Sequence, residues 1–157
     1  KQPDNLGEFT IPVGKIEVTK EGSDVTLVTY GSTWRLVMEA AAELEKIGIS
    51  AEVIDIQSLI PFDLSHEISD SVKKTNRLVI IDEDVEGGAS AFILQQILEK
   101  QKAFRYLDSD PLTIAAENHR PPYGSDGDYF SKPSVDDMVE KVYALFTETN
   151  PTKFPKI

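Results

Sequence analysis

The fold is decided by residues 25–56, which read VTLVTYGSTWRLVMEAAAELEKIGISAEVIDI. The first six are almost all apolar or β-branched, which is typical of a strand buried on both faces of a sheet. After a turn at Gly31-Ser32-Thr33, apolar residues repeat along one helical stripe, at Leu36, Ala40, Leu44 and Ile47. Gly48 ends the helix, and residues 51–56 return as a second buried strand. The stretch is therefore predicted to form a right-handed βαβ unit.

The remaining elements extend this unit or cover it. Further strands are predicted at residues 78–81 and 112–115. Three more helices are predicted: one capped by Asp63 or Ser65 and ending near Thr75, one opened by Gly87-Gly88, and one capped by Ser134 with Asp137. This alternation predicts an α/β fold, a three-layer α/β/α sandwich around a mostly parallel five-stranded sheet with one antiparallel edge strand. A ligand crevice in such a fold lies beyond the C-terminal ends of the parallel strands.

The antiparallel edge strand is predicted at residues 15–19. Polar and apolar side chains alternate there, and Glu21-Gly22-Ser23-Asp24 follows as a turn. We therefore expect this strand to pair, in a hairpin-like antiparallel arrangement, with residues 25–30.

The length of 157 residues fits one ordinary domain, which we place at residues 15–148. Residues 1–14 are predicted to be a linker from a missing upstream domain, because they are rich in Pro and Gly. Residues 149–157 are predicted to be a C-terminal tail. The first residue is Lys rather than Met, which indicates a fragment of a longer chain.

Composition narrows the choice of partners and chemistry. The net charge of −11 opposes binding to nucleic acid or to an anionic membrane, and it favours a basic protein partner. The chain has no Cys, which excludes thiol nucleophiles and Cys-ligated zinc. A sequence without Cys is also consistent with a reducing compartment, so we expect a cytoplasmic protein.

The first candidate site is the turn Gly31-Ser32-Thr33. Backbone N–H groups and two hydroxyls at a helix N-terminus stabilise an anion, and the turn is also a candidate interface, although the simpler explanation is an ordinary helix cap. Trp34 follows in the first turn of the helix, where it is either a ligand platform or interface anchor, or a core residue. There is no GxGxxG or Walker pattern, so no motif indicates dinucleotide or triphosphate binding.

The second candidate site follows the strand at residues 78–81. The acidic run Asp82-Glu83-Asp84 is either a solvated loop, which is the simpler explanation, or a weak magnesium contact. Gly87-Gly88 is either a backbone anion nest or, as we favour, a close contact between strand and helix. Glu83, Gly87 and Gly88 are also candidates for a partner interface.

The two histidines lack the neighbours that catalysis or metal binding requires. Neither His66 nor His119 has a second His at metal spacing, and no Ser lies in a nucleophile-elbow pattern. His119 and Arg120 are instead predicted to face a partner. The residues by themselves thus indicate an acidic α/β domain without a catalytic site of its own.

Several segments together resemble one enzyme family. They are residues 9–15 (FTIPVGK), 39–41 (EAA), 52–56 (EVIDI), 60–63 (IPFD), 72–78 (VKKTNRL), 87–88 (GG), 103–108 (AFRYLD) and 122–123 (PY). In order and spacing, they are similar to the C-terminal domain of the β subunit of 2-oxo acid dehydrogenases, within the wider group of transketolase C-terminal domains.

The resemblance implies a non-catalytic assembly domain of a thiamine-dependent enzyme. In the family, thiamine diphosphate and Mg²⁺ lie between an α-type domain or subunit and a pyrimidine-binding domain that would precede Lys1 here. The resemblance also implies contact with a second β subunit and docking of the basic subunit-binding domain of a dihydrolipoyl acyltransferase. The acidic composition suits that last partner.

The sequence leaves the substrate, the type of thiamine enzyme and a non-enzymatic alternative open. The motif at residues 60–63 and the segment Gly87-Gly88-Ala89-Ser90 favour a branched-chain enzyme slightly over pyruvate dehydrogenase. Another thiamine enzyme, of the transketolase or deoxyxylulose phosphate synthase type, would share the fold. A flavodoxin-like binding or signalling module is the remaining alternative, but Tyr30-Gly31-Ser32 stands where a phosphoacceptor module would place its acidic pair.

Overall fold

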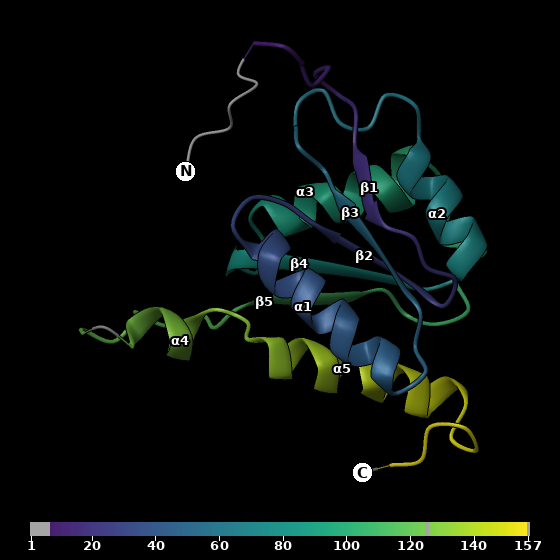
Figure 1. Cartoon of the computed structure of the whole chain (residues 1–157), viewed down its shortest axis with the longest axis vertical. Coiled ribbons are helices and arrows are strands. Elements are labelled where there is room, and N and C mark those ends of the chain that lie inside the picture. The colour runs from purple at the N-terminus through teal and green to yellow at the C-terminus, as the bar shows by residue number, and fades with distance from the viewer. Residues whose placement is uncertain (1–6, 125, 157) are drawn as a thin grey trace.

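The fold is a single mixed sheet with helices on both faces (Figure 1). We analysed a computed structural model, which describes residues 7–124 and 126–156. The strands are β1 (Glu17–Lys20), β2 (Val25–Thr29), β3 (Ala51–Asp55), β4 (Leu78–Val85) and β5 (Leu112–Ala116). The helices are α1 (Thr33–Lys46), α2 (Glu67–Thr75), α3 (Ala89–Gln95) with its π-helical continuation η1 (Gln96–Lys100), the 3₁₀ turn η2 (Ala103–Tyr106), α4 (Gly127–Ser131) and α5 (Val135–Thr149).

The sheet has the order β1-β3-β2-β4-β5. β2 pairs in parallel with β3 on one side and with β4 on the other, and every residue of β2 is buried. β5 joins β4 in parallel, and β1 is antiparallel to β3. The predicted mostly parallel five-stranded sheet with one antiparallel edge strand is confirmed, and so is the βαβ unit formed by β2, α1 and β3.

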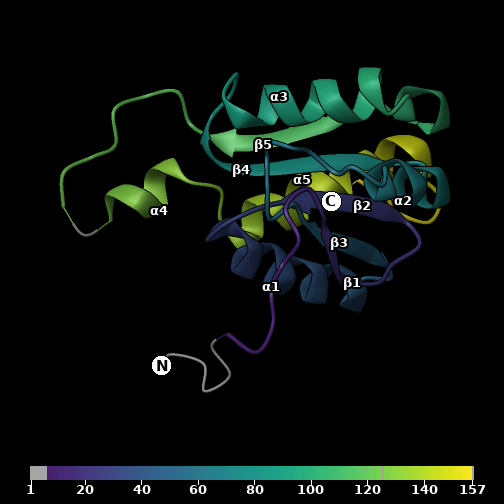
Figure 2. The ribbon, with the colours of Figure 1, turned by 90° about the horizontal axis from the view of Figure 1, so that it is seen from above.

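Two hydrophobic cores make the three layers. One core packs α1 and α5 against the sheet through residues such as Val37, Leu44 and Val142. The other packs α2, α3 and η1 against the opposite face through residues such as Ile68 and Ile93. Seen from above, the sheet lies between these two helical layers (Figure 2). The predicted α/β/α sandwich is therefore confirmed.

The predicted pairing of the first strand is wrong. β1 pairs with β3 rather than with β2, because β2 already has a parallel neighbour on each side. The turn before β2 crosses the start of β3: the N–H groups of Ser23 and Asp24 both donate to the carbonyl of Ser50. Gly22 permits this crossing, since a Cβ there would lie 2.2 Å from the carbonyl carbon of Ala51.

Helix α1 matches its prediction in extent but differs at both ends. Ala40 and Leu44 are buried as expected, but Ile47, which we expected in the stripe, is exposed beyond the last helical turn. Gly48 ends the helix with a φ of 84°. Ser32 occupies the N-cap position, yet its hydroxyl makes no cap hydrogen bond. The capping hydrogen bond predicted from a hydroxyl of this turn is therefore not made by Ser32.

The starts of α2 and α5 follow the sequence signals more closely. The carboxylate of Asp63 accepts hydrogen bonds from the N–H groups of Glu67 (3.0 Å) and Ile68 (2.9 Å), so Asp63 satisfies the first turn of α2 as predicted. At α5, Ser134 and Asp137 form the reciprocal capping box, and this prediction is confirmed.

Gly14 and Phe154, towards the two ends of the described chain, both contact the body of the fold. The N–H of Gly14 donates to Ser58 Oγ at 2.7 Å, and its carbonyl accepts from the N–H of Leu64 at 2.9 Å. After α5 the chain turns back, and Phe154 is buried with its ring 5.2 Å from that of Phe146. The chain is thus held to the body at Gly14 and at Phe154, whereas Phe9, Ile11 and Val13 are exposed.

Candidate functional site

The C-terminal edge of the parallel strands brings several predicted residues together. A groove of about 200 Å³ opens there between the start of α1, the end of β4 and the segment before α5. Its lining consists of Ser32, Thr33, Leu36, Glu83, Lys132 and Pro133. The predicted turn and the acidic run, 51 residues apart in the sequence, thus form two walls of one site.

Glu83 joins these walls. Its carboxylate accepts a hydrogen bond from Ser32 Oγ at 2.7 Å and forms an ion pair with Lys132 Nζ at 3.3 Å. The Ser32 hydrogen bond lowers the pKa of Glu83, and Lys132 adds to that shift although partial burial opposes it. A carboxylate of the protein therefore already lies at the α1 N-terminus, where we predicted an anionic ligand or an interface turn.

Asp82 forms a second, buried centre next to this groove. Its carboxylate is fully buried and accepts hydrogen bonds from Tyr30 Oη (2.8 Å), Ser90 N (3.1 Å) and Asp84 N (3.1 Å). Burial raises the pKa of the Tyr30 phenol above its ordinary value, and the hydrogen bond to Asp82 raises it further. Asp82 thus fixes the end of β2 and the start of α3 to the end of β4.

The interpretation of Asp82-Glu83-Asp84 as a solvated loop is wrong. β4 continues through Val85, so Asp82, Glu83 and Asp84 are strand residues, and only the last two are reached by solvent. The role of Asp82 could have been suspected from the sequence, because it follows a four-residue buried strand without an intervening turn residue.

The paired glycines have a different role from the one we favoured. A Cβ on Gly87 would have no atom within 4 Å, and one on Gly88 would meet Val85 O at 3.6 Å. The prediction of close strand-to-helix contact is therefore wrong. Gly87 instead adopts a φ of 91°, which favours glycine in the turn from β4 to α3.

Trp34 lies apart from this groove, on the side of α1 that faces β1. Its ring is half-buried against the core, and Nε1 donates to Thr19 Oγ1 at 2.9 Å. The indole therefore links α1 to the edge strand, which is the core-packing alternative considered for this residue.

His119 and Arg120 lie on an arm, which we define as residues 117–124 and 126–131, including α4. In Figures 1 and 2 this arm extends away from the body between β5 and α5. Arg120 stacks on the ring of Tyr123, 4.7 Å from its centroid, and also hydrogen-bonds to the Tyr123 hydroxyl. A groove of about 260 Å³ separates the arm from α5, with Tyr129, Phe130 and Asp137 among its lining residues.

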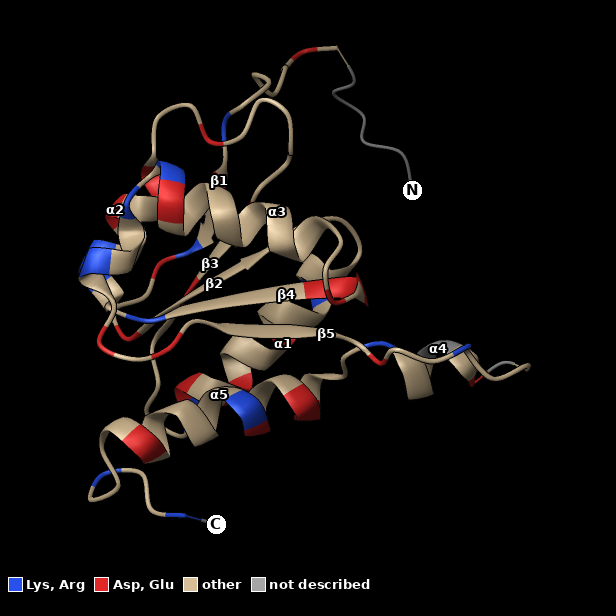
Figure 3. Ribbon diagram, turned by 180° about the vertical axis from the view of Figure 1, so that it is seen from behind, with Lys and Arg blue, Asp and Glu red and all other residues tan. Residues whose placement is uncertain are grey.

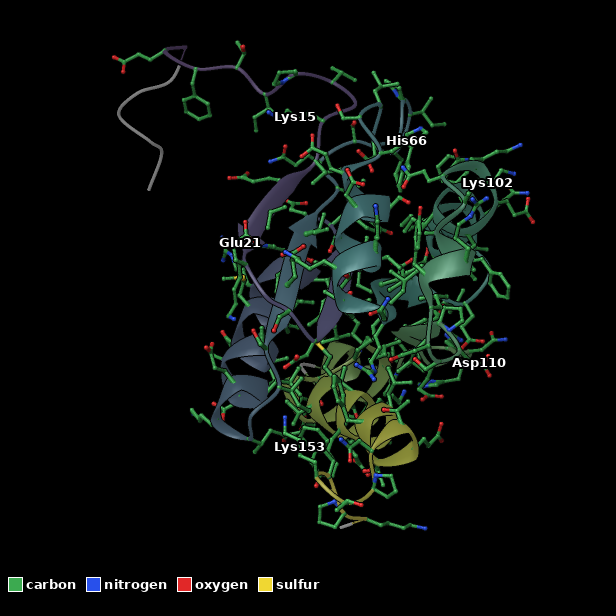
Figure 4. All side chains as sticks on the ribbon, turned by 90° about the vertical axis from the view of Figure 1, so that its right-hand side faces the viewer. Lys15, Glu21, His66, Lys102, Asp110 and Lys153 are labelled. Carbon is green, nitrogen blue, oxygen red and sulfur yellow. The ribbon has the colours of Figure 1, made fainter. Side chains whose placement is uncertain are left out.

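The histidines do not come together. His66 is the N-cap residue before α2 and has a φ of 59°, whereas His119 is on the arm. Figure 4 shows His66 at the same end of the molecule as Lys15, with Lys153 at the opposite end. Within residues 7–124 and 126–156, no three His, Cys, Asp or Glu residues gather as metal ligands. None of the helices in this part of the chain is long and apolar enough to span a membrane.

Comparisons with known proteins give the family. The transketolase C-terminal domain family matches residues 14–134. The chain is 38% identical over 141 residues to the pyruvate dehydrogenase E1 component subunit beta of Rhizobium meliloti, covering 89% of this chain and 30% of the relative. It is 39% identical over 132 residues to the mitochondrial subunit beta-2 of the same component from Oryza sativa subsp. japonica, covering 83% of this chain and 34% of that protein.

A solved structure supports the same conclusion. The chain superposes on a split gene transketolase, described as an inactive beta4 tetramer, with a TM-score of 0.71 and 26% identity, covering 92% of this chain and 46% of that one. The chain thus spans about a third of the length of the two pyruvate dehydrogenase subunits, and less than half of the transketolase chain. With a family match over most of its length, this chain belongs to the transketolase C-terminal domain family.

Proposed function

We propose that this chain is the C-terminal assembly and docking domain of the thiamine diphosphate-dependent decarboxylase component of a 2-oxo acid dehydrogenase. Its parent enzyme would decarboxylate a 2-oxo acid oxidatively and transfer the acyl group to lipoamide. The observation that carries the proposal is the similarity to two pyruvate dehydrogenase E1 subunits over more than four-fifths of the chain. The relatives' names favour pyruvate, and the branched-chain preference suggested by residues 60–63 stays a prediction.

The residues at the C-terminal edge support a role without catalysis. Asp82 is committed to Tyr30 and Ser90, and Glu83 to Ser32 and Lys132. Carboxylates bound in this way within the protein hold neighbouring elements together, whereas an acid or base in catalysis must reach a substrate proton.

We propose no site for thiamine diphosphate and Mg²⁺ among the residues described here. Mg²⁺ with a diphosphate would be held by one or two carboxylates, and the phosphates by free N–H or hydroxyl donors. The carboxylates of Asp82 and Glu83 already accept hydrogen bonds from Tyr30 and from Ser32, the hydroxyl at the α1 turn. We therefore assign the cofactor to other parts of the parent enzyme, an α-type domain or subunit and an upstream pyrimidine-binding domain.

The acidic surface supports docking of a basic domain. Figure 3 shows acidic residues along α5, and Asp136, Glu140 and Glu148 are exposed on this helix. Such a surface attracts a basic partner by long-range steering, and salt weakens the attraction. The partner we propose is the subunit-binding domain of a dihydrolipoyl acyltransferase.

Calorimetric titration of this chain with that subunit-binding domain tests the docking role. We expect binding whose affinity falls at least tenfold between about 50 and about 200 mM salt, because exposed charges are screened over that range. Glu140→Lys should weaken binding, while Glu99→Lys, the same change on η1 across the sheet, should leave it unaltered. No binding, or binding insensitive to salt and to Glu140→Lys, would overturn the docking role.

A second titration tests the cofactor assignment. Thiamine diphosphate with Mg²⁺ should neither release heat nor raise the melting temperature of the chain, because a ligand that binds the native state raises the apparent stability. A rise in the melting temperature would show that this chain holds the cofactor by itself.

The structural comparison favours one alternative, a transketolase-type parent enzyme. The split gene transketolase shares the fold over 92% of this chain. The two parents differ in their acceptor, because a 2-oxo acid dehydrogenase passes its acyl group to lipoamide and a transketolase passes a ketol unit to a sugar. Binding to the acyltransferase domain would therefore separate them.

A further inference from the structure

A positively charged surface lies on the layer of α2, η1 and η2. It consists of Lys73 on α2, Lys100 on η1, Lys102 before η2 and Arg105 on η2, and all four side chains are exposed. We call these four residues the basic patch. Lys73 Nζ lies 5.9 Å from the centroid of the Tyr106 ring, which brings the cation of α2 beside η2. The basic patch is therefore a local excess of positive charge on a chain whose net charge is −11.

The charge of the basic patch is not neutralised by the described chain. None of its four cations forms an ion pair with another described residue. Residues 97–106 contain a single acidic side chain, Glu99, which accepts a hydrogen bond from Gln95 at 3.3 Å. On the other face of the sheet, α1 and α5 carry more acidic than basic residues, whereas the reverse holds for α2, η1 and η2 together. The two faces of the sandwich therefore differ in charge.

An exposed aromatic ring lies among these cations. Phe104 stands between Lys102 and Arg105 in the sequence, and its side chain is 69% exposed. The backbone around it is fixed, because Ala103 is fully buried and the carbonyl of Tyr106 accepts a hydrogen bond from Asn76 Nδ2 at 2.7 Å. A ring presented on a rigid turn beside an Arg is typical of protein contacts, since aromatic residues and Arg are enriched there and little entropy is lost on binding.

We infer that the basic patch binds a short acidic segment of another protein, whose carboxylates pair with the four cations and whose apolar side chains cover the ring of Phe104. The charge complementarity is local: at physiological salt, exposed charges are screened beyond about 8 Å, so a short segment responds to the patch and not to the net charge of the chain.

The borders of the basic patch favour such a segment over a nucleic acid. Glu99 precedes Lys100, and Asp70 lies one turn before Lys73 on α2, and both carboxylates are exposed. A nucleic-acid strand carries its phosphates without interruption, so it would meet these carboxylates, whereas a protein segment places acidic residues only where they are matched. The patch and the acidic surface of α5 lie on opposite faces of the sheet. The inference therefore goes beyond the proposed function, and an acidic segment and a basic docking domain can bind at the same time.

Fluorescence anisotropy with a designed peptide tests the inference. The probe is the fluorescein-labelled peptide Glu-Asp-Leu-Glu-Glu-Leu-Glu-Asp, which should bind this chain saturably with a Kd below about 1 mM at low salt. Arg105→Glu should weaken binding at least about tenfold and reduce its salt dependence, because it places a like charge opposite the peptide. Phe104→Ala should weaken binding at least about fivefold and leave the salt dependence unaltered, because it removes apolar contact and no charge.

The matched control is Arg35→Glu, the same charge change at an exposed residue of α1 on the other face of the sheet, which should leave peptide binding unaltered. Circular dichroism on every variant checks that the fold is retained. Absence of saturable binding, equal binding of the same peptide with Gln and Asn in place of its acidic residues, or full binding by Arg105→Glu would overturn the inference. Tighter binding of an oligothymidylate of equal charge would also overturn it, in favour of a nucleic acid. Titration with the acyltransferase domain is a separate measurement, so failure here leaves the proposed function in place.

Discussion

The hydroxyl of Ser32 and the carboxylate of Glu83 lie 2.7 Å apart, and this contact joins the first residue before α1 to the end of β4. A serine at the N-cap position ordinarily uses its side-chain oxygen to accept a hydrogen bond from a backbone N–H in the first turn of its own helix. Here the Ser32 hydroxyl donates its hydrogen bond to Glu83 on β4 instead. The negative charge of Glu83 thereby lies at the N-terminal end of α1, where the helix dipole favours it.

Ser32→Ala should raise the pKa of Glu83. The Ser32 hydrogen bond is the largest cause that lowers this pKa, so its loss moves the value back toward 4.5. A carboxyl with a lowered folded-state pKa contributes stability above its unfolded pKa and loses it as pH falls through the folded value. An NMR titration of the Glu83 side chain measures the change. Ser65→Ala, at an exposed serine before α2, is the control, and an unaltered Glu83 pKa in Ser32→Ala would contradict the assignment.

Tyr30→Phe should destabilise the fold by about 1–3 kcal/mol, because it removes a hydrogen bond to the buried carboxylate of Asp82. Urea unfolding measures the free energy. The matched control is Tyr143→Phe, because the Tyr143 hydroxyl donates to the exposed carbonyl of Pro155 in the segment after α5. That change should cost less than about 0.5 kcal/mol. Equal losses in the two variants would mean that Asp82 does not depend on Tyr30.

Glu52→Gln should destabilise the protein by about 1–3 kcal/mol near neutral pH, because it breaks a contact between a buried carboxylate and the ammonium of Lys74. Burial alone would raise the pKa of Glu52, but hydrogen bonds from Lys74 and Ser71 outweigh it and leave the pKa lowered. The contribution is therefore present above pH 4.5 and is lost as pH falls through the lowered folded-state pKa.

Lys74, the partner of Glu52, has a pKa shifted in the opposite direction. The pKa of Lys74 is raised by the hydrogen bond from its ammonium to Glu52, so its contribution is complete below pH 10.5 and is lost only at higher pH. In the acid range, the free energy of unfolding should therefore change less with pH for Glu52→Gln than for the unaltered chain. Glu45→Gln, which affects an exposed pair with Lys20, is the control. Parallel pH profiles for Glu52→Gln and the unaltered chain would refute this account.

Gly22→Ala should cost about 2–3 kcal/mol, because the added Cβ would lie 2.2 Å from the backbone of Ala51, and one of the two segments must move. Thermal unfolding followed by circular dichroism measures the loss. Ser23→Ala, in the same turn but exposed, should change stability by less than about 0.5 kcal/mol. If Gly22→Ala were as mild as its neighbour, the close crossing of β3 would not exist in solution.

The sheet and its central unit could be predicted because their signals are local. The buried runs of β2 and β3 and the stripe of α1 each lie within one short segment, and the hand of the crossover follows from chirality. The partner of β1 could not be predicted in this way. A turn at residues 21–24 looks the same whether the strand before it pairs with β2 or passes over to β3, and only Gly22 hints at the close crossing.

The site was harder to predict than the fold, for a physical reason. Ser32 and Glu83 each looked like part of an exposed turn or loop, and their contact depends on β2 and β4 being neighbours. Asp82 looked solvated because acidic residues rarely occur in buried strands without a partner. Tyr30, its hydrogen-bond partner, directly follows a different strand, β2, so the sequence around either residue gives no sign of the contact.

The anchoring of Gly14 by Ser58 and Leu64 has a mechanical consequence. A load applied through the N-terminal segment meets these two contacts before it reaches the four residues of β1. Since β1 is the outermost strand, it would otherwise be peeled from the sheet one hydrogen bond at a time. The contacts at Gly14 would have to break first, so a pull on the N-terminal segment does not act directly on the hydrogen bonds between β1 and β3.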